Sequence, residues 1–208
     1  MKIVNFTNCL LSKTRVGKMK KVFIKSEKDL YSKLFIYRSL LCKNREFFIE
    51  EKSSDDAKAI CTALNIKNKK KRIEYVYDYC INRVDEFYRE KNYCNFENGQ
   101  CKCQREENSN RKNGCCLICV YQTENGCPTQ NLSCKLFYCN EISKKQEMFP
   151  LRDLKILKVF GFRRRLIAID NFFAKREDVI TDIEVGLLTF YSLRAIYRII
   201  RNMVKVRY

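Results

Sequence analysis

The stretch IEYVYDYCINRVDEF, residues 73–87, carries the clearest structural signal in the sequence. Its apolar side chains recur at intervals of three and four residues, at Ile73, Val76, Cys80, Val84 and Phe87. In an α-helix this spacing places them on one continuous face. The stretch therefore predicts a long amphipathic helix that buries this face in a core.

Weaker patterns on the N-terminal side predict further short elements. Ser26 and Ser54 each precede a stretch with helical spacing, and a serine hydroxyl can accept a hydrogen bond from an unpaired first-turn amide. The expected elements in this part are two helices, over residues 27–42 and 55–64, and two short strands, at 22–24 and 47–49.

The C-terminal part is also expected to be helical. Pro150 suits the first turn of a helix over residues 151–160, and Gly161 is placed to end that helix. Residues 162–170 fit a strand or a helix equally well, and a long last helix is expected over 176–204. With two prolines and six glycines in 208 residues, the chain is predicted to be mostly α.

An unusually dense cluster of cysteines interrupts this helical body. Nine of the thirteen cysteines fall within residues 94–139: Cys94, Cys101, Cys103, Cys115, Cys116, Cys119, Cys127, Cys134 and Cys139. Asn-Gly pairs stand just ahead of three of them, and such pairs favour tight turns whose amide hydrogens can stabilise metal-bound thiolates. The pattern predicts an inserted, loop-rich metal-binding module whose ligands are all cysteines.

The choice of metal follows from the ligand chemistry. Because the chain has no histidine, any site here is all-sulfur, which suits zinc or an iron–sulfur cluster and disfavours hard cations. Cys116 and Cys119 form a C-x2-C pair typical of zinc sites, and the ferredoxin spacings are absent. We expect Zn²⁺, with an iron–sulfur cluster as the alternative. A disulfide framework is disfavoured by the odd cysteine count and by the lack of a visible secretory signal.

The later part of this segment resembles known bacterial sequences. Residues 113–116, 119–127 and 132–139 look like a group of small cysteine-rich bacterial proteins with no assigned activity. More loosely, the doubled cysteine, Gly126-Cys127 and the run from Cys134 to Phe137 are similar to bacterial cysteine domains regarded as zinc or iron chelators. The usual C-x2-C-x2-CC opening and an Arg-Pro pair before the late cysteine are missing. The resemblance implies metal binding and assigns no further function.

The formal charge of +18 points to an anionic partner. Residues 92–140 hold five Lys/Arg against four Asp/Glu, so the positive charge lies in the flanks. Two basic features are candidates for contacting nucleic acid or an anionic surface: Lys69, Lys70, Lys71 and Arg72, and the stripe of Arg194, Arg198, Arg201 and Lys205. A solvated loop is the default interpretation of the first, and a favourable helix dipole is the simpler explanation of the second.

The last expected helix also has an apolar stripe next to the basic one, formed by Leu193, Ile196, Ile200 and Met203. A lipid-surface helix is therefore a further interpretation of this region. No run of eighteen apolar residues exists, so no transmembrane span is expected, and a cytoplasmic location is predicted.

Four segments follow from these patterns. They are a basic N-terminal segment (1–25), a helical segment (26–91), the cysteine-rich metal module (92–140) and a second helical segment (141–208) that packs on the first. The predicted function is a non-enzymatic metal-binding protein whose basic helices contact nucleic acid or another polyanion. The alternatives are an iron–sulfur electron-transfer protein and a zinc-stabilised interaction module. Enzymatic activity stays open but is disfavoured, because no histidine can serve as base for a nucleophilic cysteine.

Overall fold

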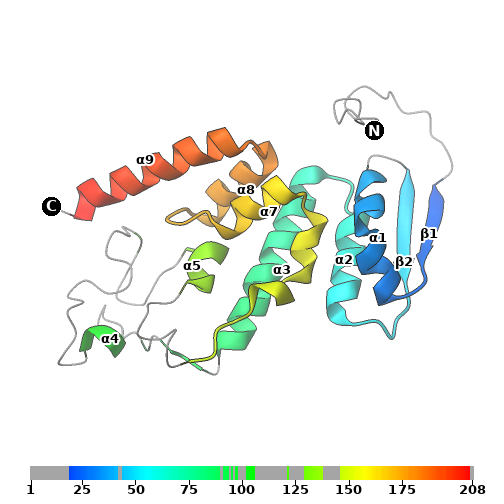
Figure 1. The fold of residues 1–208 in the computed structure, drawn as a ribbon, viewed down its shortest axis with the longest axis horizontal. Coiled ribbons are helices and arrows are strands. Elements are labelled where there is room, and N and C mark those ends of the chain that lie inside the picture. The colour runs from blue at the N-terminus through cyan, green and yellow to red at the C-terminus, as the bar shows by residue number, and fades with distance from the viewer. Residues whose placement is uncertain are drawn as a thin grey trace. The chain divides into compact units, whose positions relative to one another are not determined.

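The computed structural model describes residues 19–41, 44–89, 91–93, 95, 97, 102–105, 121, 129–137 and 146–206 (Figure 1). These residues are mostly helical, which confirms the predicted fold class at that level. Most of the cysteine-rich segment lies outside them. The chain forms two compact units, one up to Arg72 and one from Ile73 onward.

The first unit contains two parallel strands joined by a helix. Strand β1 (Lys20–Ile24) pairs with β2 (Arg45–Ile49), and α1 (Glu27–Ser39) makes the crossover between them. Helix α2 (Asp55–Asn65) packs against β2 and α1. Leu30, Phe47 and Ile60 are almost completely buried in this core.

Both serine caps of the first unit are confirmed. The Asp29 amide donates to Ser26 Oγ at 3.2 Å, and the Ala57 amide donates to Ser54 Oγ at 3.3 Å. Each bond satisfies an amide that has no partner inside its own helix.

The second unit is built on α3 (Lys69–Arg89), whose first turn still belongs to the first unit. The predicted apolar face is confirmed, since Ile73, Val76, Cys80 and Val84 are at most 2% exposed. Further along, Phe87 packs edge-on against Phe149 at a ring-centroid distance of 5.3 Å. The other α-helices among the described residues of this unit are α4 (Lys102–Arg105), α5 (Leu132–Leu136), α7 (Phe162–Ile169), α8 (Arg176–Val185) and α9 (Leu188–Val206).

The helix expected over residues 151–160 is wrong. The chain forms two short 3-10 helices instead, η2 (Leu151–Asp153) and η3 (Lys155–Val159), separated at Leu154. Five apolar residues are buried here: Leu154, Ile156, Leu157, Val159 and Phe160. In one continuous α-helix these side chains would spread over more than half of the circumference. The two 3-10 helices bury all five. Gly161 consequently precedes α7 rather than ending a helix. The segment that fitted a strand or a helix is helical over Phe162–Ile169.

The single last helix predicted over residues 176–204 is also wrong. Gly186 divides it with a φ of +68°, and its amide donates to the Asp182 carbonyl at 2.8 Å. This is the left-handed helix end that glycine adopts more easily than any other residue. The break allows α9 to fold back as a separate helix that contacts α7.

Candidate functional site

Of the nine cysteines predicted to bind metal, Cys134 is the one whose side chain the structure describes. Cys134 lies on α5 and is half-buried. Cys103 lies in α4, but its side chain is outside the described residues, as are Cys94, Cys101, Cys115, Cys116, Cys119, Cys127 and Cys139. Over the described part of the chain, no group of three or more potential ligands could hold a metal ion. The metal site therefore stays a prediction, and α5 is the part whose geometry is defined.

Asn131 caps the start of α5 and ties it to the unit. Its Oδ1 accepts a hydrogen bond from the Cys134 amide at 3.0 Å, which fixes the backbone of the candidate ligand. Its Nδ2 donates to the carbonyls of Asn171 and Ala174, both at 2.8 Å. Asn131 is fully buried, so three satisfied hydrogen bonds hold a polar side chain that would otherwise be costly to bury.

The next two residues add buried hydrogen bonds to the body of the unit. The Leu132 amide donates to Tyr77 Oη of α3 at 2.8 Å. Ser133 Oγ accepts a hydrogen bond from the Asn171 amide at 2.8 Å. Burial raises the pKa of Tyr77, so this hydroxyl stays protonated over the whole physiological range. Helix α5 is thus fixed by contacts on both sides of its first turn.

The described cysteines outside residues 94–139 are core residues. Cys80 is fully buried on α3, which confirms that it fills space in the core. The Cys61 thiol is 6% exposed and donates to the Phe47 carbonyl at 3.3 Å. Burial raises the pKa of Cys61 to about 11. A thiol that holds its proton in this way is neither a metal ligand nor a nucleophile at neutral pH.

The basic stripe predicted on the last helix points toward α8. Arg198 is 5% exposed, and its Nη2 lies 2.9 Å from Asp182 Oδ2. Arg194 Nη2 lies 2.8 Å from Asp178 Oδ1, and Arg194 Nε lies 3.2 Å from Asp182 Oδ1. Two of the four predicted phosphate contacts are therefore engaged in ion pairs inside the unit.

The remaining two members of the stripe differ. Arg201 Nη2 donates to Tyr121 Oη at 2.6 Å. The Lys205 side chain lies outside the described residues.

The buried acceptors Asp182 and Asn171 were not identified from the sequence. Asp182 is fully buried on α8 and also accepts from Asn171 Nδ2 at 2.9 Å, while Asn171 Oδ1 accepts from Arg198. A signal was available: Asp178 and Asp182 are four residues apart, as are Arg194 and Arg198 on the next helix. Matching i, i+4 pairs of opposite charge can align when two helices lie side by side.

The other basic group, Lys69 to Arg72, forms the first turn of α3. Lys69, Lys70 and Lys71 are exposed, and Arg72 Nη1 donates to the Ile66 carbonyl at 2.6 Å. No acidic residue occurs in this turn. Because the N-terminal end of a helix is already positive, these cations are placed where they do not stabilise the helix.

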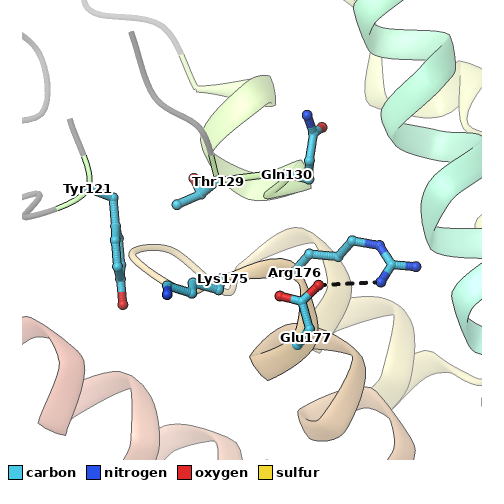
Figure 2. Close-up of a pocket in the computed structure, with 6 residues that line it drawn as sticks. All are labelled: Tyr121, Thr129, Gln130, Lys175, Arg176 and Glu177. Carbon is cyan, nitrogen blue, oxygen red and sulfur yellow. Dashed lines mark ion pairs between the residues drawn. The ribbon is translucent and has the colours of Figure 1, made fainter. Parts of the chain in front are cut away.

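A pocket of about 300 Å³ lies between the cysteine-rich segment and the start of α8 (Figure 2). Tyr121, Thr129 and Gln130 line one side, and residues 175–177 line the other. The ammonium of Lys175 and the guanidinium of Arg201 each lie 5.8 Å from the centre of the Tyr121 ring. Tyr121, which belongs to the predicted metal segment, therefore lies close to the start of α8.

Arg176, which lines this pocket, is bonded to another helix. Figure 2 shows the Arg176 side chain directed away from Tyr121, and its guanidinium makes two hydrogen bonds of 2.6 Å to Asp78 of α3. Hydrogen bonding to Asp78 raises the pKa of Arg176. With Glu177 also on the wall, the pocket has mixed charge and selects no particular class of ion.

Comparisons with protein-family models, with curated proteins and with solved structures gave no match. Across the described residues, no helix combines the length and the apolar character needed to cross a bilayer.

Proposed function

We propose that the protein binds metal through the cysteines of residues 94–139, with Zn²⁺ as the first candidate. The observation that supports this best is the anchoring of α5, which carries Cys134. Its buried cap, Asn131, donates from its side chain to the segment before α8. The Leu132 amide donates to Tyr77 of α3, and Lys135 pairs with Asp85 of the same helix. One candidate ligand thus sits on a rigid support, as metal sites require.

The burial of the described cysteines agrees with this proposal. Cys61 and Cys80 are enclosed by the core, where a thiolate would be strongly disfavoured. Cys134 is partly accessible and is the eighth of the nine cysteines in the dense cluster. Residues 94–139 are rich in polar side chains, so metal ligation would supply much of their folding free energy.

The proposal is tested by metal analysis of the full chain purified without oxygen. A colourless protein that contains stoichiometric zinc supports the zinc site. A brown protein that contains iron and inorganic sulfide replaces zinc with the iron–sulfur alternative, and a protein without bound metal overturns the proposal.

Matched cysteine variants assign the ligand. Cys134→Ala is expected to lower the zinc content or to weaken zinc retention against a chelator. Cys80→Ala removes the same atoms from the core, and zinc binding in this control should be unchanged. If both variants retain zinc equally, Cys134 is not a ligand.

Contact with a polyanion is the second candidate function, and it depends on Lys70 and Lys71. Both side chains are exposed, and helix stability gives no reason for their position. Arg194 and Arg198 support it less, because both form ion pairs with α8. Replacement of the two lysines by glutamine should flatten the salt dependence of duplex DNA binding by up to about 1.8 log units per log unit of salt.

A further inference from the structure

Helix α9 directs Arg194 and Arg198 toward the protein and most of its described apolar side chains toward solvent. Arg194 and Arg198 contact α8, and Tyr191, 8% exposed, bonds to Asp170. These residues are spaced three and four apart, so they occupy one side of the helix. The inward side is therefore polar.

The outward side of α9 is a broad uncharged surface, called here the outer face. Leu193 is 70% exposed, Tyr197 is 64% exposed and Ile200 is 55% exposed. Five more apolar side chains are exposed along the same helix: Phe190, Ile196, Ile199, Met203 and Val204. The exposed polar residues next to them, Thr189 and Ser192, are uncharged.

This arrangement is the reverse of an ordinary surface helix. An amphipathic helix of a water-soluble domain buries its apolar stripe and exposes its charges. A contiguous apolar surface of this kind marks a site that binds another molecule or a membrane. With 19 residues, α9 is about 28 Å long, so the outer face is extended rather than a small hollow.

We propose that the outer face of α9 binds an anionic lipid surface, with the helix lying in the plane of the interface. Helices that bind in this way combine an apolar face with a polar face rich in Lys and Arg. Residues 186–208 contain five Lys/Arg and no Asp/Glu. The formal charge of +18 adds long-range attraction of the whole chain to an anionic surface.

Charge and polarity favour an anionic bilayer over a second copy of the chain or nucleic acid. A second copy of the chain also carries +18, so electrostatic repulsion opposes pairing of two such helices. Nucleic acid presents phosphates and polar edges and would leave the apolar side chains in water. An anionic bilayer complements both properties of α9, since its headgroups attract cations and its acyl region accepts apolar side chains.

The experiment uses a tryptophan reporter, because the chain contains no tryptophan of its own. Tyr197→Trp places the reporter on the outer face, and Phe35→Trp places a control on α1, where Phe35 is 73% exposed. Vesicles of phosphatidylglycerol and phosphatidylcholine should shift the Tyr197→Trp emission to the blue, and lipids brominated in the acyl chains should quench it. The Phe35→Trp emission should not change.

Three outcomes overturn the proposal. The first is an unchanged Tyr197→Trp emission with vesicles. The second is emission that is already blue-shifted without lipid, which would show that a second copy or another segment of the chain covers the outer face. A response to duplex DNA without acyl-chain quenching assigns the surface to nucleic acid and also overturns it.

A paired variant tests affinity independently. Ile196→Gln with Ile200→Gln should reduce binding to anionic vesicles at least about tenfold, because both side chains enter the acyl region. Phe35→Gln with Ile36→Gln removes two exposed apolar side chains from α1 and should leave binding unchanged. Equal losses in both pairs would show that the attraction is general rather than a property of α9.

Discussion

Helices α3 and α9 have similar sequence patterns, but their apolar faces point in opposite directions, inward in α3 and outward in α9. Both are long, with 21 and 19 residues, and both carry apolar side chains at intervals of three and four. The apolar stripe of α3 is buried in the core, whereas that of α9 is exposed and its arginines face the protein. Periodicity thus defines the faces of a helix, but the neighbouring elements decide which face is turned inward.

Helix α8 determines which face of α9 is turned inward. Asp178 and Asp182 present carboxylates at the spacing of Arg194 and Arg198, and Asn171 completes the buried network. Removing such charges from water is costly, so the arrangement is stable only while each charge keeps its partner. This dependence distinguishes the inner face of α9 from the apolar inner face of α3.

The largest expected effect follows from removing the carboxylate that pairs with Arg198. Asp182→Ala leaves the buried Arg198 guanidinium without its main carboxylate, which should lower the free energy of unfolding by about 3–5 kcal/mol. Urea unfolding followed by circular dichroism measures this. The double variant Asp182→Leu with Arg198→Met removes both charges and should lose less than about 2 kcal/mol. A single variant that loses under about 1 kcal/mol would show that the network does not hold α9.

A matched pair of isoleucines compares the apolar faces directly. Ile81 of α3 is 4% exposed and Ile200 of α9 is 55% exposed. Ile81→Ala should lower the free energy of unfolding by about 2–5 kcal/mol, because it removes apolar burial and leaves a cavity. Ile200→Ala should stay within about 0.5 kcal/mol of the original protein, as expected of a surface position. A large loss for Ile200→Ala would mean that the outer face is covered in the isolated protein.

The sequence predicted the elements whose signals are local. The caps at Ser26 and Ser54, the long helix α3 and the burial of Cys80 required only spacing and side-chain chemistry. The break at Gly186 also had a local signal, but the continuous apolar pattern on both sides concealed it.

Other features depend on tertiary partners and could not be predicted in the same way. Asn131 binds carbonyls 40 and 43 residues away, and Tyr77 accepts a hydrogen bond from an amide 55 residues away. The inward turn of Arg198 depends on Asp182 of a different helix. The metal site is the opposite case. The density of cysteines predicts it, but most of its residues lie outside those that the structure describes.

The smallest expected effect compares the charged ends of the two helices. Lys70 lies in the first turn of α3, where the helix dipole is positive, and Lys205 lies in the last turn of α9, where it is negative. Lys70→Gln should raise the free energy of unfolding by about 0.3–1 kcal/mol, and Lys205→Gln should lower it by a similar amount. Glutamine and lysine have nearly equal helix propensity, so the change isolates the charge. Both differences should shrink in high salt, which screens exposed charges. If Lys70→Gln is instead destabilising, Lys70 has a stabilising contact in the folded chain, and its position no longer indicates a site kept for a polyanion.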